Sequence, residues 1–247
     1  MKNMSQLILL DTIDSTNEYA KREYQNFDQN KLICIAASKQ THGKGRFQRK
    51  WFSPDEKNIY ATFYKRLRSQ DLHYNIGQIL AFSTLKAVQS INISLQIKWP
   101  NDLLFHKKKI GGILTETIFE TPFIHCFIGI GLNVNMSEKT LSSLDIEATS
   151  LKMIAEKNID PINLLKKIQK QFEEDLEIFE KEGFKFFKNK IEKHLAYVDQ
   201  EITIKEADNY HHGKILSLTD QGMLKFYDLK TKQMLILRSG DLSMKID

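Results

Sequence analysis

The sequence predicts an α+β fold, in which a mixed β-sheet flanked by helices is followed by a small C-terminal β-barrel. Up to His194, apolar runs with the alternation of strands are interspersed with stretches of helical periodicity. From Glu201 onward only short strand-like segments follow, joined by turns. The 247 residues, 41% of them hydrophobic, suffice for one sizeable domain and a small one, expected at residues 1–196 and 197–247.

The predicted elements follow one another from a strand at residues 7–10. A helix from Asp14 to Tyr24 comes next, with Ser15 and Glu18 at the spacing of a capping box, and Asp71 is expected to cap a later helix. Further helices are predicted at residues 149–157, 161–182 and 184–194. Strands are predicted at residues 32–38, 59–65, 95–99, 109–119 and 123–132, with 103–105 as a link, and barrel strands at 201–205, 212–218, 223–228 and 233–237.

Composition narrows the class of function. The formal net charge of +5 is mild and is spread along the chain, which fits an anionic small ligand and does not require nucleic acid. Cys34 and Cys126 lie in apolar runs without a Cys-x-x-Cys spacing, so we expect buried thiols in a reducing compartment. The apolar run Leu7 to Leu10 is too short for a signal peptide, and no stretch approaches transmembrane length, so we expect a cytoplasmic enzyme.

Residues 39–58 are predicted to form a long loop, and within it residues 40–54 combine two glycines, several cations and a tryptophan. The glycines let the backbone approach an anion, the cations supply charge and the tryptophan supplies an apolar plate. The residues concerned are Gly43, Gly45, Lys44, Arg46, Arg49, Lys50 and Trp51. The loop lacks the spacing of a P-loop, and by itself it is equally consistent with a solvated, flexible segment.

Further motifs accompany this loop along the chain. They are Asp14-Ser15-Thr16-Asn17, Lys98-Trp99-Pro100-Asn101-Asp102, Lys109-Ile110-Gly111-Gly112-Ile113, residues 128–135, Ala148-Thr149-Ser150-Leu151 and residues 240–244. In order and approximate spacing, the set resembles the biotin protein ligases over essentially the whole chain. The resemblance implies a class II synthetase-like catalytic domain of the biotin/lipoate ligase type with a small C-terminal SH3-like β-barrel.

The resemblance also implies an activity. Such an enzyme activates biotin with ATP as biotinyl-5'-AMP, with Mg²⁺, and transfers biotin to a lysine of a biotin carboxyl carrier protein domain of a biotin-dependent carboxylase. Members of the family that act as repressors carry an N-terminal helix-turn-helix domain. The first strand here starts near Leu7, so we expect a monofunctional ligase that does not bind operator DNA. We expect a monomer or a homodimer.

Site residues follow from the resemblance position by position. Ser15, Thr16 and Gln40 would bind the ureido head of biotin. Gly129 and Gly131 would line the bottom of the pocket, where their lack of a side chain leaves room for the ligand. Catalytic roles would fall to Lys109, Arg46 and Asp102, because fixed cations stabilise charge that develops at the α-phosphate. Trp51 and Lys44 would shield the adenylate from water. The full expected binding set is Ser15, Thr16, Asn17, Gln40, Gly43, Lys44, Gly45, Arg46, Arg49, Trp51, Asn101, Lys109, Gly112, Gly129, Gly131 and Asn133.

Several points stay open in the sequence. Asn101 and Asp102 would organise the nucleotide or its Mg²⁺, and which of the two touches the metal is open. Asp102 would also aid deprotonation of the acceptor lysine, and for Asn133 a turn-forming role has equal weight with ligand binding. Alternation along the strand would place only one of Lys108 and Lys109 in the site.

One residue departs from the family pattern. Gln48 stands where many members carry glycine, and because a Cβ restricts positive φ, the loop conformation and the role of Arg49 are open.

Two other functions and a metal site fit the sequence less well. A lipoate or octanoyl ligase of the same superfamily should show an Arg-Arg-x2-Gly-Gly-Gly type loop, which this sequence lacks. A nucleic-acid-binding protein could use the basic loop with Trp51, but the weak net charge disfavours it. His211-His212 has no third ligand at suitable spacing, so an exposed hairpin is favoured over a metal site.

Overall fold

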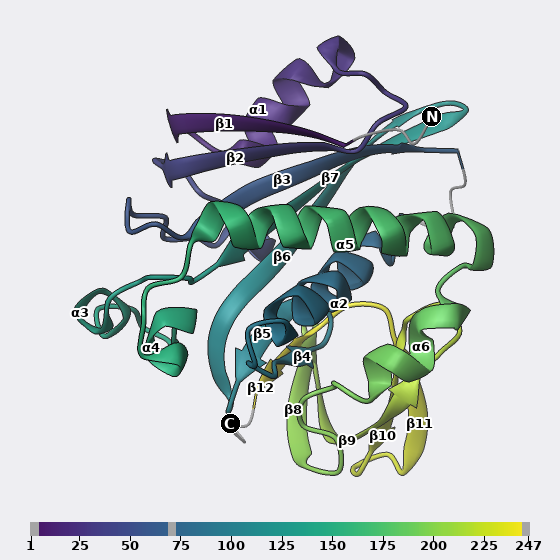
Figure 1. Cartoon of the computed structure of the whole chain (residues 1–247). Helices are drawn as coiled ribbons and strands as arrows, with labels where there is room; N and C mark the ends of the chain where they lie inside the picture. Colours follow the sequence, from purple (N-terminus) through teal and green to yellow (C-terminus); the bar gives the residue numbers. More distant parts are fainter. Residues whose placement is uncertain (1–4, 69–72, 244–247) are drawn as a thin grey trace.

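Two β-sheets of different size organise the molecule (Figure 1). The computed structural model describes residues 5–68 and 73–243. A seven-stranded mixed sheet with helices against it comes first, and a five-stranded antiparallel sheet follows at the C-terminal end. The predicted α+β class, with a flanked mixed sheet and a small β unit after it, is therefore confirmed.

The large sheet has the strand order β1-β2-β3-β7-β6-β5-β4. Only β1 and β2 pair in parallel, and every other neighbouring pair is antiparallel. The prediction of a link at residues 103–105 is wrong, because this segment forms a strand that pairs with both β4 and β6. The strands are β1 (Gln6–Ile13), β2 (Ile33–Gln40), β3 (Ile59–Leu67), β4 (Gln96–Lys98), β5 (Asp102–Phe105), β6 (Lys108–Glu120) and β7 (Phe123–Leu132).

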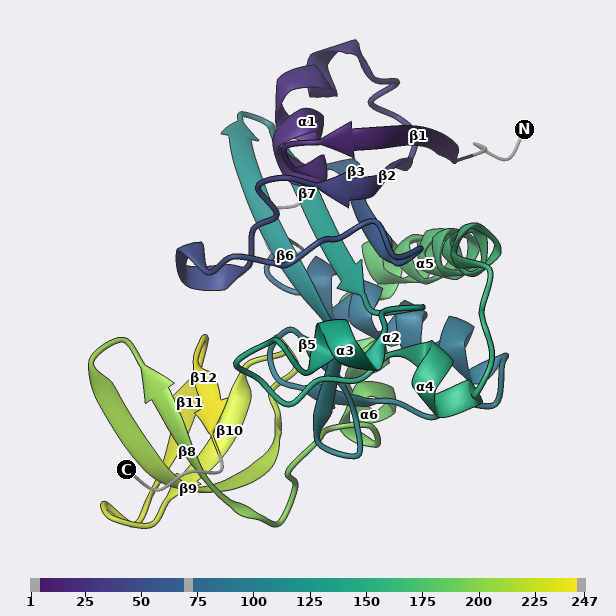
Figure 2. The same cartoon turned by 90° about the vertical axis from the view of Figure 1, so that its left-hand side faces the viewer.

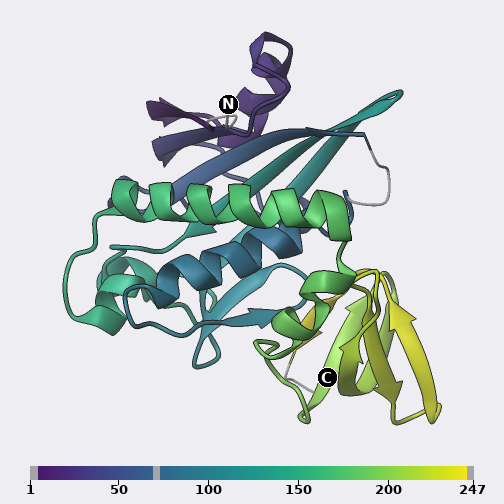
Figure 3. The ribbon, with the colours of Figure 1, turned by 45° about the vertical axis from the view of Figure 1, so that its right-hand side comes forward.

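Helices cover the two faces of this sheet unequally. The long helices α2 (Ile76–Gln89) and α5 (Pro161–Glu182) lie side by side across one face and bury the main core (Figure 3). The shorter α1 (Thr16–Glu23) lies on the other face over β2, β3 and β7, above a small cluster that includes Phe127. The remaining helices are α3 (Glu138–Leu141), α4 (Leu151–Ala155) and α6 (Lys185–Glu192). None of the helices in the described ranges is both long and apolar enough to cross a bilayer.

Helix starts agree with the sequence only in part. Asp160 accepts hydrogen bonds from the amides of Ile162 and Asn163 and so caps α5 where it was predicted. The predicted capping box of α1 is wrong: Ser15 is the N-cap residue, but its side chain caps no backbone amide. Residue 71, the expected cap of α2, lies outside the described residues, and Asn75 occupies the N-cap position.

The helices after β7 are shorter than the sequence suggested. The segment predicted as helix over residues 149–157 forms only α4, which Ser150 caps through the amide of Met153. The last predicted helix, over residues 184–194, is confined to α6.

The small sheet has the order β11-β10-β9-β8-β12 and lies away from β1 and α1 (Figure 2). Its last strand, which the sequence pattern did not reveal, pairs with β8 and returns the chain toward the large sheet. The strands are β8 (Glu201–Glu206), β9 (Asn209–Leu218), β10 (Leu224–Asp228), β11 (Gln233–Leu237) and β12 (Asp241–Ser243). The domain boundary between residues 196 and 197 stays a proposal.

Alternation along β7 creates the space for a site. Cys126, Ile128 and Ile130 belong to the core under α2 and α5. Phe127, Gly129 and Gly131 point to the opposite face, because successive side chains of a strand alternate. Phe127 packs under α1, and the two glycines after it carry no side chains of their own, so that Asn17 of α1 lies over Gly129 and Trp51 lies over Gly131.

Candidate functional site

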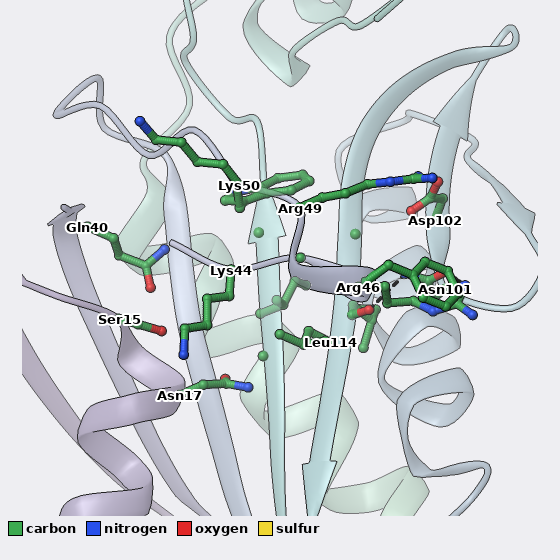
Figure 4. A pocket seen from close by; sticks show the side chains of 18 of the residues that line it. Ser15, Asn17, Gln40, Lys44, Arg46, Arg49, Lys50, Asn101, Asp102 and Leu114 are labelled. Atoms are coloured by element: carbon green, nitrogen blue, oxygen red, sulfur yellow. Dashed lines mark hydrogen bonds between the residues drawn. The ribbon is translucent and has the colours of Figure 1, made fainter. Parts of the chain in front are cut away.

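A pocket lies on this part of the sheet, between the N-terminus of α1 and the loop of residues 40–54 (Figure 4). It brings together all of the site residues predicted from the sequence except Gly43 and Asn133. Lys50, Phe47, Leu114, Ile146 and Asp241 also line it and were not in the predicted set.

One end of the pocket carries neutral polar groups. The backbone amide and the hydroxyl of Thr16 both donate to Gln40 Oε1, at 2.9 and 3.2 Å, and Gln40 Nε2 donates to Ser53 Oγ at 2.9 Å. The Thr62 hydroxyl lies 2.8 Å from Thr16 Oγ1 and also contacts Asn17 Oδ1. These bonds orient Gln40 and Thr16, so the end of the pocket is a fixed set of neutral donors and acceptors.

The Asn17 amide is held over Gly129. Its Nδ2 donates to Glu116 Oε2 at 2.8 Å, and its Oδ1 accepts from the Thr62 hydroxyl. A Cβ on Gly129 would lie 2.5 Å from Asn17 Oδ1, so no other residue fits there without displacing Asn17. Thr62 and Glu116 support the site, and the sequence did not single them out because their partners are distant along the chain.

An ion-pair cluster ties the basic loop to α1. Lys44 Nζ lies 2.6 Å from Glu18 Oε1, and Lys21 Nζ bridges Glu18 and Glu116 at 2.8 and 3.0 Å. Figure 4 shows Lys44 reaching from the loop toward Ser15 and Asn17. Hydrogen bonds from Lys21 and Lys44 lower the pKa of the Glu18 carboxyl below its usual value. Glu18 thus serves this cluster instead of the predicted capping box.

The hairpin of β5 and β6 supplies the central ion pair. Lys109 Nζ lies 2.8 Å from Asp102 Oδ1, with the two side chains 26% and 15% exposed. The same ammonium lies 5.4 Å from the centre of the Trp51 ring. Lys108 is exposed and does not line the pocket, as strand alternation predicted. Lys109 is therefore a partly buried cation with a fixed position.

Two arginines of the loop connect the pocket to the small sheet. Arg46 Nη1 donates to Asn101 Oδ1 at 2.9 Å and to the Gly240 carbonyl at 3.1 Å, and Arg49 pairs with Asp241 Oδ2 at 2.7 Å. Burial lowers the pKa of the Arg46 guanidinium, which nonetheless stays charged at any physiological pH. Sequence reasoning placed residues 240–244 only at the close of the small barrel and missed Asp241 as a lining residue.

The backbone of the loop corrects the expectation for Gln48. Gln48 adopts a φ of 60° in spite of its Cβ, and Phe47 before it has a φ of 57°. Two consecutive left-handed residues other than glycine are unfavourable, at about 1–2 kcal/mol each. The loop therefore keeps a turn that glycine would adopt more easily, and Arg49 still reaches Asp241.

Two predicted residues lie outside the pocket. Gly43 stands where the loop crosses itself: a Cβ there would lie 2.5 Å from the Trp51 carbonyl oxygen. Asn133 is buried, and its Nδ2 donates to the Thr149 carbonyl at 3.1 Å, so it joins two chain segments rather than facing a ligand. The structure does not bring Asn133 to the pocket, and its side-chain bond joins segments 16 residues apart instead of closing a local turn.

The pocket has few groups for a hard cation. Asp102 and Asp241 are the only carboxylates among its described lining residues, and the Asn101 amide oxygen is already bonded to Arg46. Mg²⁺ that accompanies a nucleotide needs only one or two carboxylates, because phosphates and water supply its other ligands. Asp102 and Asp241, each of which also pairs with a cation of the protein, are therefore the residues that would hold such an ion.

Comparisons with known proteins agree on one family. Residues 9–133 match the model of the biotin/lipoate A/B protein ligase family. The chain is 31% identical over 224 residues to the bifunctional ligase/repressor BirA of Bacillus spizizenii, covering 88% of this chain and 68% of that protein. The corresponding protein of Escherichia coli is 29% identical over 222 residues, covering 87% of this chain and 67% of its own.

A solved structure agrees over almost the full length. The biotin protein ligase of Aquifex aeolicus, in complex with biotin and ATP, superposes with a TM-score of 0.78. The two chains are 30% identical, and the match covers 98% of each.

Proposed function

Because this chain belongs to the biotin/lipoate A/B protein ligase family, we propose that it is a biotin protein ligase. It activates biotin with ATP as biotinyl-5'-AMP and transfers the biotinyl group to a lysine of a carrier protein. The observation that carries this function is the two-ended pocket. Thr16, Asn17 and Gln40 suit the neutral ureido head of biotin, and Lys109, Arg46 and Arg49 suit the meeting of a carboxylate with a phosphate.

In the first step an oxygen of the biotin carboxylate attacks the α-phosphorus of ATP. The bond between the α-phosphorus and the bridging oxygen breaks, and pyrophosphate leaves. We assign to Lys109 the neutralisation of charge that builds on the α-phosphate, because its ammonium is held by Asp102 and Trp51. Arg46, which Asn101 and the Gly240 carbonyl hold in place, is assigned to the phosphates. Mg²⁺ held by Asp102 or Asp241 would supply further positive charge on the phosphates.

In the second step the amine of the acceptor lysine attacks the acyl carbon, and AMP leaves. The amine must lose a proton for this attack. Asp102, a partly buried carboxylate in the pocket, is the group assigned to receive or orient it. Lys44 and Trp51 are assigned to cover the adenylate, because the mixed anhydride hydrolyses when water reaches it.

The acceptor in this proposal is the biotin carboxyl carrier protein domain of a biotin-dependent carboxylase. We propose that the chain acts in the cytoplasm, as its two free buried cysteines favour, and as a monomer or homodimer. We also propose that it does not bind operator DNA, in keeping with its mild net charge of +5. Specific retention of a biotin-operon fragment at moderate salt would contradict the last point.

The direct test is transfer of radiolabelled biotin to a purified carrier domain. With ATP we expect label in the carrier, and without ATP or with the acceptor lysine changed to arginine we expect none. Lipoate serves as the matched substrate control, because the family also includes lipoate ligases. Transfer of lipoate in place of biotin, or no ATP-dependent labelling, would contradict the proposed function.

A further inference from the structure

Trp51 is partly buried in the pocket, and its indole nitrogen is buried with the N–H unpaired. Within residues 5–68 and 73–243, Trp51 Nε1 is the one buried side-chain nitrogen or oxygen without a hydrogen-bond partner. The other tryptophan, Trp99, donates from Nε1 to the Gly222 carbonyl at 3.1 Å. Leaving a buried donor unpaired costs about 1–3 kcal/mol, so an orphaned group calls for an explanation. A ligand that supplies the acceptor would provide one.

Strand β7 fixes where along the pocket this N–H lies. Gly129 and Gly131 face the same side and lie about 7 Å apart along the strand. The Asn17 amide sits over Gly129, and the Trp51 indole sits over Gly131, where a Cβ would lie 2.4 Å from Nε1. The indole N–H is therefore displaced from the neutral polar end by two residues of strand.

The same ring borders the cationic end of the pocket. Its Cζ3 would lie 3.4 Å from a Cβ on Gly112, the β6 residue paired with Gly131, and its centre is 5.4 Å from Lys109 Nζ. An acceptor about 2.9 Å from Nε1 would thus lie beside the same ring whose centre is 5.4 Å from the Lys109 ammonium. An oxygen that carries negative charge is the acceptor that suits both a cation and a neutral N–H.

We propose that the Trp51 Nε1–H donates a hydrogen bond to the charged end of the acyl substrate. The acceptor is a carboxylate oxygen of biotin in the first step and an oxygen of the acyl phosphate once biotinyl-5'-AMP has formed. The assignment rests on the proposed function and goes beyond the role of an apolar cover, because it makes the indole nitrogen a binding group. Trp51 then holds the carboxylate in line for attack, and Lys109 balances its charge.

Calorimetry with two ligands tests the assignment on the full chain. Trp51→Phe keeps a smaller aromatic ring and removes the donor, and biotinol replaces the carboxylate of biotin by an alcohol, so that comparing the two ligands separates the lost donor from the lost ring area. Relative to the wild type, we expect Trp51→Phe to bind biotin at least tenfold more weakly and biotinol within about twofold. The matched control is Trp99→Phe, which loses the bond to Gly222 and should melt at a lower temperature but bind both ligands normally.

Nuclear magnetic resonance tests the same bond in the wild-type protein. The chain has two tryptophans, so it gives two indole N–H signals, which Trp51→Phe assigns. Added biotin should move the Trp51 proton downfield and leave the Trp99 signal in place.

Three outcomes would overturn the assignment alone. These are unchanged biotin affinity of Trp51→Phe, equal losses for biotin and biotinol, and an unmoved Trp51 signal in wild-type protein that binds biotin. Wild-type protein that binds no biotin at all would overturn the proposed function itself.

Discussion

Replacing Lys109 by alanine is the sharpest test of the assigned chemistry. The side chain is 26% exposed and its ammonium lies 2.8 Å from Asp102, so its surroundings lie between water and a dry interior. At an effective dielectric constant of about 20, a cation about 4 Å from a developing negative charge contributes about 4 kcal/mol. Removing a single donor to an oxyanion costs enzymes about 3–4 kcal/mol, which agrees with this value.

A loss of about 3–4 kcal/mol corresponds to a 10²- to 10³-fold slower formation of biotinyl-5'-AMP. The change should leave the fold intact, because a partly exposed ion pair contributes at most about 1 kcal/mol to the free energy of unfolding. Single-turnover conversion of α-labelled ATP measures the rate of the first step, and thermal unfolding monitors the fold.

Lys108→Ala is the matched control for this experiment. It removes the same charge from the neighbouring residue, which is exposed and lies outside the pocket, so its rate should stay within about twofold of the wild type. Equal rates for Lys109→Ala and Lys108→Ala would refute the reasoning.

Three further predictions concern Gly129, Gln48 and the two cysteines. Gly129→Ala places a Cβ 2.5 Å from Asn17 Oδ1, so in steady-state assays the KM for biotin should rise at least tenfold while the KM for ATP changes little. An unchanged KM for biotin would argue against a fixed Asn17. Gln48→Gly relieves the strain of a Cβ at a φ of 60°, and part of this gain is offset by the conformational entropy of glycine. The free energy of unfolding should therefore increase by up to about 1 kcal/mol, which corresponds to a melting temperature about 2–4 °C higher. Gln48→Ala should not show this increase. Burial raises the pKa of the Cys126 thiol from 9.0 to about 12 and raises that of Cys34 as well, so both thiols stay neutral in the folded chain at pH 8 and should react with a disulfide reagent only after denaturation. Because the thiols ionise near pH 9 only in the unfolded chain, the free energy of unfolding should fall as the pH rises above that value. Rapid labelling of the native protein would contradict this burial.

The fold could be predicted where the signals were local. Alternation located most strands of the large sheet, and Pro161 marked the start of α5. Strand β5 was missed because four residues carry too little alternation, and only its pairing with β4 and β6 makes it a strand.

The site could be predicted as a set of residues but not as a set of contacts. Ser15 and Glu18 have the spacing of a capping box, yet Lys44, 26 residues away in sequence, binds the Glu18 carboxylate. Asp241 joins Arg49 across most of the chain, and no local pattern encodes such a pair. Asn133 lies in a motif that matches the family and was expected to bind ligand, but its amide is hydrogen-bonded to the Thr149 carbonyl inside the protein.

The three ion pairs of the pocket have a consequence for how it would take up an anion. Lys44 faces Glu18, Arg49 faces Asp241 and Lys109 faces Asp102, so each cation already has a counterion from the protein. At these three cations an arriving phosphate would exchange with a carboxylate, and the affinity gained there is the difference between two ion pairs. Such exchange holds the cations in place before the ligand arrives, and it would also weaken their hold on an anionic product.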